Sequence, residues 1–214
     1  MKTKIISLLL GCLISGTAFA QFVPDMQPQQ PLSVGLSSNM MNFAAASQEG
    51  SQWCWAASIQ MVFQRYGVNI SQTRIVTRSY GTDQFGHPPN WPGSWQVITA
   101  NLNNWNLDEV TGMPYQVACQ FGQGAPPPTI LINELANGCP VILAYRSSPT
   151  SGHAVVITGA RYYPTPTGPN VVSVIVRDPW PSPENIANRG RKEYEAAQFA
   201  QLMQGYWLVR VQRP

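Results

Sequence analysis

Residues 48–66 read QEGSQWCWAASIQMVFQRY, and this stretch decides the fold. From Cys54 onward most positions are apolar, while two glutamines one helical turn apart mark a solvent-facing side. Gly67 follows directly and is a typical helix stop. We therefore predict a central, buried helix over residues 54–66 that carries a cysteine in its first turn.

Cys54 is the candidate nucleophile because of this position. The unpaired N–H groups and the positive dipole end of a helix N-terminus favour a thiolate over a thiol. A thiolate at neutral pH also needs a cationic neighbour, and the chain has two histidines. His87 lies in a loop rich in Pro, Gly and aromatic residues, whereas His153 follows Gly152 and opens an apolar run. Because a strand holds an imidazole on rigid backbone, we favour His153 as the base.

Asp178 is the candidate group that orients this imidazole. A catalytic imidazole normally has its far N–H held by a carboxylate or an amide. Asp178 ends the apolar run over residues 171–177 and precedes Pro179, which places a carboxylate at the end of a neighbouring predicted strand. Asn170 and Asn185 are alternatives for the same role.

The order of the predicted elements indicates an α+β domain. Helical patterns dominate the first part of the chain, and short β-branched runs separated by Gly, Pro and Ser dominate the second. We expect helices over residues 54–66, 95–103, 130–137 and 193–203, and strands over 141–145, 153–160, 171–177 and 206–212. Helices first and strands later argue against a doubly wound parallel sheet.

The segment from Gln48 to Ser58 resembles the active-site segment of papain-like cysteine peptidases, which have a glutamine six residues before the nucleophile and Cys-Trp-Ala at it. Segments at Cys139-Pro140, Gly152-His153 and Arg177-Asp178-Pro179 look closer to bacterial members of that superfamily. Those members are the double-glycine, bacteriocin-processing peptidases and the secreted effector proteases, in which Asp replaces the Asn of plant enzymes. The resemblance covers roughly residues 45–212.

This resemblance implies a papain-like fold, in which an N-terminal helical half with a buried catalytic helix packs on a C-terminal antiparallel β-sheet half. It also implies a cysteine endopeptidase with Cys54 as nucleophile, His153 as base and then acid, Asp178 as orienter and Gln48 as oxyanion donor. The enzyme would hydrolyse a protein or peptide substrate through a thioester, with no cofactor and no metal ion.

Two other functions are compatible with the same residues. A papain-fold acyltransferase or transpeptidase would pass the acyl group of the thioester to an amine or thiol in place of water. A non-catalytic peptide-binding module would keep the cleft, and its cysteine would have ordinary thiol reactivity.

Residues 1–20 have the pattern of a secretory signal peptide. Two lysines precede a short apolar run, and Ala18-Phe19-Ala20 fits the small-x-small cleavage pattern. A lipoprotein signal that ends at Cys12 is the alternative. We expect a secreted or periplasmic protein with an extended leader over residues 21–45, which could cover the cleft, and a peptidase domain over residues 46–214.

Composition limits the partners that the protein can have. Of its 214 residues, 44% are hydrophobic and 10% aromatic, which indicates a folded chain rather than a disordered one. Charged residues make up only 11% and the formal net charge is +3, so no strong field attracts nucleic acid. No stretch reaches the ~20 consecutive apolar residues of a membrane span. The oligomeric state is not predicted.

Three cysteines lie beyond residue 20, and an odd number in an exported protein leaves one thiol unpaired. The simplest assignment is a disulfide between Cys119 and Cys139, with Cys54 free. A zinc site that includes the two histidines is the alternative, although the sequence lacks the close ligand pairs of structural zinc. The basic run from Arg189 to Lys192 is expected to be a solvated loop, or to contact a substrate carboxylate.

Overall fold

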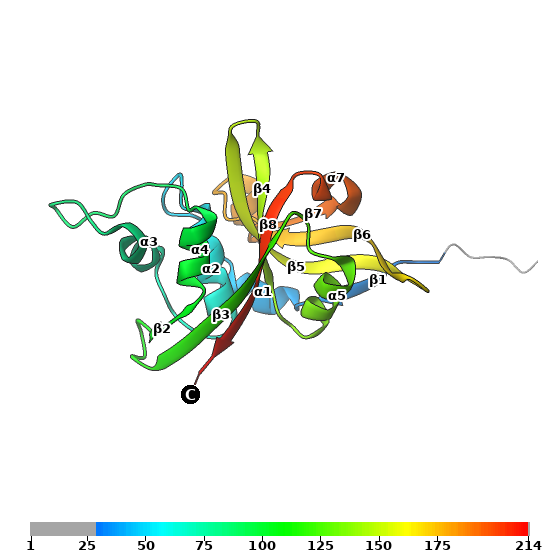
Figure 1. Cartoon of the computed structure of the whole chain (residues 1–214), viewed down its shortest axis with the longest axis horizontal. Coiled ribbons are helices and arrows are strands. Elements are labelled where there is room, and N and C mark those ends of the chain that lie inside the picture. The colour runs from blue at the N-terminus through cyan, green and yellow to red at the C-terminus, as the bar shows by residue number, and fades with distance from the viewer. Residues whose placement is uncertain (1–28, 214) are drawn as a thin grey trace, which may run out of the picture.

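One antiparallel sheet organises the described part of the chain, which in this computed structural model is residues 29–213 without the side chains of 104–106 (Figure 1). Its path runs β2-β3-β8-β4-β5-β6-β7, and β1 pairs with β5 beside this path. The strands are β1 (Leu32–Gly35), β2 (Asn104–Leu107), β3 (Pro114–Gln123), β4 (Val141–Ser148), β5 (Ser151–Thr165), β6 (Gly168–Arg177), β7 (Arg191–Glu195) and β8 (Met203–Gln212). The predicted signal peptide lies outside the described residues.

Helices cover both faces of the sheet, and the first four form the helical half (Figure 1). They are α1 (Ser38–Ala44), α2 (Cys54–Arg65), α3 (Gln72–Tyr80), α4 (Trp95–Asn101), α5 (Pro128–Ala136), α6 (Pro183–Asn188) and α7 (Ala196–Ala200). Helix α2 is the central one, because eight of its twelve residues are buried.

The central strands are buried on both faces, which explains why they read as continuous apolar runs. In β4, Ile142 points into a core shared with α2, whereas Val141 and Leu143 point into a second core shared with α5 and α7. In β5, Val156 points into the core shared with α2, and Val155 points into the core shared with α5 and α7. This period-2 alternation places α2 on one side of the sheet and α5 and α7 on the other.

The predicted α+β architecture is confirmed: helices come first, and an antiparallel sheet forms most of the second half. The predicted helix over residues 193–203 is shorter than expected, because residues 191–195 form β7 and only Ala196–Ala200 are helical. The sequence of β7, RKEYE, holds four charged residues and one tyrosine, and charged side chains suit a strand at the edge of a sheet.

The structure also differs from the extended leader predicted over residues 21–45. Residues 32–35 form β1, which pairs antiparallel with β5. Residues 38–44 form α1, in which Met41 and Ala44 are buried. The side chain of Asn42 also accepts a hydrogen bond from Arg177. From Leu32 onward this segment is therefore part of the folded domain.

The predicted disulfide between Cys119 and Cys139 is wrong, since both cysteines are free in the structure. Cys119 lies on β3 opposite Val209 of β8, and Cys139 lies just before β4, on the other side of β8. Two strand spacings of about 4.8 Å each exceed the roughly 7 Å between Cα atoms that a disulfide can bridge. The strand order therefore keeps the two sulfur atoms apart.

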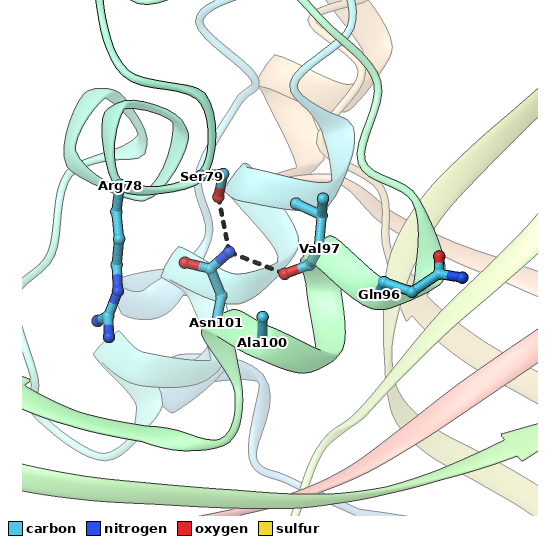
Figure 2. Close-up of a pocket in the computed structure, with 6 residues that line it drawn as sticks. All are labelled: Arg78, Ser79, Gln96, Val97, Ala100 and Asn101. Atoms are coloured by element: carbon cyan, nitrogen blue, oxygen red, sulfur yellow. Dashed lines mark hydrogen bonds between the residues drawn. The ribbon is translucent and has the colours of Figure 1, made fainter.

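A cavity of about 330 Å³ lies between α3 and α4 in the helical half (Figure 2). The amide nitrogen of Asn101 crosses from α4 to Ser79 Oγ of α3 at 2.8 Å and also donates to the Val97 carbonyl oxygen at 2.9 Å. These bonds tie the two helices together. The exposed Arg78 lines the same cavity from α3.

The described helices are all too short or too polar to cross a bilayer.

Candidate active site

Cys54 is the first residue of α2, as the sequence predicts. Trp53 precedes it, and no side chain caps this helix end. The first N–H groups of α2 therefore have no capping acceptor, and the positive end of the helix dipole lies at the sulfur. The thiol is partly exposed and is not bonded to another cysteine.

His153 and Asp178 meet from neighbouring strands of the sheet. His153 is near the start of β5, and Asp178 directly follows β6. His153 Nε2 lies 2.7 Å from Asp178 Oδ1, and the two side chains are only 12% and 4% exposed. Cys54 lies close enough to the His153 ring to raise the pKa of the imidazole. The structure thus brings together the three residues that the sequence predicts.

This arrangement makes the imidazole of His153 unusually basic. Burial lowers the pKa of His153, but hydrogen bonds to Asp178 and Cys54 and the charges of both groups outweigh it and raise the pKa to about 9. Burial would likewise raise the pKa of the Asp178 carboxyl, yet hydrogen bonds from His153, the Trp180 N–H and Lys192 hold it well below its usual range. An imidazolium at His153 beside an ionised Asp178 carboxylate is the expected charge state at neutral pH.

Lys192 is also a member of this site, although the sequence predicted a solvated loop from Arg189 to Lys192; in the structure Lys192 lies in β7. Its Nζ lies 2.9 Å from Asp178 Oδ2, so each carboxylate oxygen of Asp178 has its own cationic partner. The backbone N–H of Trp180 also donates to Oδ1 at 2.9 Å. One feature of the sequence could have drawn attention to Lys192: it is the only lysine after residue 4.

A tight turn holds Asp178 against the end of β7. The Asp178 N–H donates to the Gly190 carbonyl oxygen at 2.8 Å, and a Cβ added to Gly190 would lie 2.4 Å from the Asp178 carbonyl oxygen. Gly190 has a φ of 72°, so glycine is required both for the turn and for the close approach. The preceding Arg189 is also left-handed, with a φ of 56°.

Gln48 is buried beside the site, but its amide is already engaged. Its backbone N–H donates to the Pro179 carbonyl oxygen at 2.8 Å, which links it to the segment after Asp178. Its Nε2 donates to the carbonyl oxygens of Gly50 and Ser51 at 2.9 and 3.0 Å. Both amide protons therefore support the loop before Cys54, while Oε1 is buried with no partner among the described residues.

The other sequence candidates lie elsewhere or play supporting roles. His87 is 77% exposed in the loop before α4 and pairs with Asp83, its Nδ1 at 3.5 Å from Oδ2. Asn170 lies opposite Tyr163 near the far end of the β5–β6 hairpin. Asn185 is buried, and its Nδ2 donates to the Trp180 carbonyl oxygen at 2.8 Å, so it fixes the segment that follows Asp178.

An aromatic group borders His153 on the side of β4. Tyr145, opposite His153 in the β4–β5 register, meets the imidazole edge-on with ring centroids 5.7 Å apart. Phe199 of α7 packs against Tyr145, with centroids 4.9 Å apart. Within residues 29–213, no group of three His, Cys, Asp or Glu side chains could hold a metal ion.

Comparison with known proteins adds a family match. The model of the Peptidase_C39-like family matches residues 40–212. Among solved structures, the peptidase domain of Streptococcus ComA, a bifunctional ABC transporter involved in a quorum-sensing pathway, is 15% identical and aligns with a TM-score of 0.48. That alignment covers 80% of this chain and 99% of the ComA domain. A search of curated proteins gives no match.

Proposed function

We propose a function from one premise: the chain belongs to the Peptidase_C39-like family, whose model spans residues 40–212. The family match confirms the predicted resemblance to papain-like cysteine peptidases. We infer that the protein is a cysteine endopeptidase that hydrolyses peptide bonds in a protein or peptide substrate. The observation that carries the proposal is the contact of Cys54, His153 and Asp178, which come from α2, β5 and the end of β6.

In the proposed reaction, the Cys54 thiolate attacks the carbonyl carbon of the scissile peptide bond. The tetrahedral intermediate collapses as the C–N bond breaks, and His153 gives its proton to the leaving amine. Water, deprotonated by His153, then attacks the thioester and releases the carboxylic acid, and Cys54 leaves as the thiolate. Asp178 holds the imidazole in the orientation that both proton transfers need.

The oxyanion of each intermediate needs hydrogen-bond donors. The backbone N–H of Cys54 at the uncapped end of α2 is one candidate. Gln48 is the other candidate donor. One of its two Nε2–H groups would leave its present acceptor, the carbonyl oxygen of Gly50 or Ser51, and donate a hydrogen bond to the oxyanion instead. In this proposal Gln48 shapes the loop in the resting enzyme and serves as a donor once substrate is bound.

We also propose that the protein acts outside the cytoplasm. This proposal rests on the signal-peptide pattern of residues 1–20, which lie outside the described part of the chain. The free state of Cys119 and Cys139 lends it no support.

Replacement of the sulfur tests the proposed function. Cys54→Ala should abolish cleavage of a fluorescently labelled unfolded protein such as casein and abolish labelling by the epoxide E-64, because the nucleophile is gone. Cys139→Ala, at another partly exposed cysteine, should keep both. Equal cleavage by the wild type and Cys54→Ala would disprove the proposal. Addition of an amine separates hydrolysis from acyl transfer, because only an acyltransferase gives an amide product.

A further inference from the structure

Arg177, at the end of β6, is a buried cation without an acidic partner. It is only 2% exposed. Its Nη1 donates to Asn42 Oδ1 at 2.8 Å and to the carbonyl oxygens of Asn188 and Arg189 at 3.3 and 3.0 Å. All three acceptors are neutral, and Nε is buried without a partner among the described residues. Within residues 29–213, no carboxylate forms an ion pair with this guanidinium.

A second arginine adds positive charge at the same place. Arg191 lies opposite Arg177 in the β6–β7 register, and burial together with the charge of Arg191 lowers the pKa of Arg177. Glu193 Oε2 lies 3.9 Å from Arg191, but the other oxygen of Glu193 is bound by Ser173 and lies 3.7 Å from Arg161. One carboxylate therefore serves two arginines, and the charge of Arg177 is not balanced.

Both arginines line one cavity of about 240 Å³. Its lining contains no acidic residue but includes Ser33 and Ser38, whose hydroxyl groups can donate hydrogen bonds. At the β1 wall the backbone approaches β5 closely, since a Cβ added to Gly35 would lie 2.4 Å from the Thr158 carbonyl oxygen. The cavity in Figure 2 differs, because its arginine, Arg78, is exposed and already solvated.

We propose that the cavity between β1 and the ends of β6 and β7 binds a small oxyanion, a phosphate, sulfate or carboxylate group, between Arg177 and Arg191. Burial of an unpaired cation is costly, and a bound anion restores its pairing. Guanidinium groups are well suited to this ligand because they donate two parallel hydrogen bonds to an oxyanion. The inference does not depend on peptidase activity.

The position of the cavity links it to the candidate active site. Arg177 directly precedes Asp178, and the carbonyl groups that Arg177 binds belong to the turn that leads into Gly190. Gly190 in turn accepts the hydrogen bond from the Asp178 N–H. A bound oxyanion would hold Arg177, and with it the turn that fixes Asp178.

Thermal unfolding of the full chain in increasing inorganic phosphate tests the proposal, with sodium chloride at matched ionic strength as reference. At ten times the dissociation constant, phosphate should raise the Tm by about 3–5 °C. Arg191→Gln should weaken phosphate binding about tenfold, because it removes one guanidinium. The matched control is Arg78→Gln, which makes the same charge change at the cavity in Figure 2 and should respond as the wild type does.

Parallel titrations with sulfate and acetate distinguish an inorganic anion from a carboxylate as the ligand, and calorimetric titration of phosphate gives the dissociation constants directly. Arg191 is exposed, so Arg191→Gln is expected to fold, and its circular dichroism spectrum checks this. The proposal is overturned if none of the three anions stabilises the protein beyond chloride, if Arg191→Gln binds as tightly as the wild type, or if Arg78→Gln is the variant that loses binding.

Discussion

Two histidines in this chain each lie beside an aspartate, yet their surroundings differ in every respect. His87 and Asp83 are four residues apart in one loop, 77% and 49% exposed, and 3.5 Å apart. His153 and Asp178 come from separate strands, are 12% and 4% exposed, and are 2.7 Å apart. Water competes with the first pair and screens it, whereas the second pair is held by the sheet in a low dielectric.

The comparison shows what a pair of residue types needs before it can do chemistry. An exposed His–Asp ion pair is a weak contact, because water solvates and screens both partners. The buried pair adds a third partner, Cys54, and a fourth, Lys192, each from a different element. The fold, rather than the residue types, therefore makes His153 the candidate catalytic base.

The largest expected effect is the loss of the buried imidazole. His153→Ala should lower kcat/KM for peptide cleavage by about 10⁵-fold or more, because proton transfer to and from Cys54 and the leaving group is lost. His87→Ala should leave kcat/KM within about twofold of the wild type. Steady-state assays of the two variants measure this difference. If both variants lost a similar share of kcat/KM, the buried His–Asp pair would not be the catalytic one.

Replacement of the buried aspartate should also lower activity far more than replacement of the exposed one, although by less than the loss of His153. Asp178→Ala should lower kcat by about 10⁴-fold, since it removes both the charge that stabilises the imidazolium and the acceptor that orients it. Asp83→Ala, which makes the same change in the exposed pair, should leave kcat unaltered. Pre-steady-state release of the amine product would assign the loss to acylation. If Asp178→Ala retained full activity, Asp178 would not be the orienting group.

The raised pKa of His153 should also appear as pH-dependent stability. A group whose pKa is higher in the folded state stabilises the fold fully below its unfolded pKa, here about 6.5, and loses this contribution as the pH rises through about 9. The expected loss is up to about 3 kcal/mol of unfolding free energy between these values. Urea unfolding from pH 6 to pH 10 measures it. The decline should persist in His87→Ala and flatten in His153→Ala, and an unchanged slope in the latter would contradict the assignment.

The smallest expected effect concerns Lys192, the partner that the exposed pair lacks. Lys192→Met should lower kcat about five- to tenfold with little change in KM, because Asp178 loses one of its fixed partners. Lys192→Arg keeps the charge and should restore most of the activity.

A second measurement separates positioning from a general loss of stability. The lowered pKa of Asp178 gives stability that is present above its unfolded pKa of about 3.9 and is lost as the pH falls. Without Lys192 that pKa rises, so Lys192→Met should unfold at a higher pH during acid titration. If its acid-unfolding midpoint matched that of the wild type, Lys192 would not act through Asp178.

Much of the fold could be predicted from the sequence because its signals are local. The apolar run after Cys54 and the stop at Gly67 placed α2, and the β-branched runs placed β4, β5 and β6. The charged sequence of β7 gave no strand signal, because an edge strand with one exposed side has little apolar content. The segment before residue 45 was likewise missed, because only its pairing with β5 makes it a strand.

The sequence by itself determined the chemistry available to this protein: a cysteine at the start of an apolar helix, a histidine at the start of one strand and an aspartate at the end of another. Tertiary structure alone brought the favoured histidine to the cysteine, joined Lys192 to Asp178, kept Cys119 from Cys139 by the position of β8 and buried Arg177 beside Arg191. The physical reason is the separation of the contacting residues along the sequence. Periodicity and caps depend on neighbours a few residues away, whereas contacts across 14 to 99 positions depend on strand order and register.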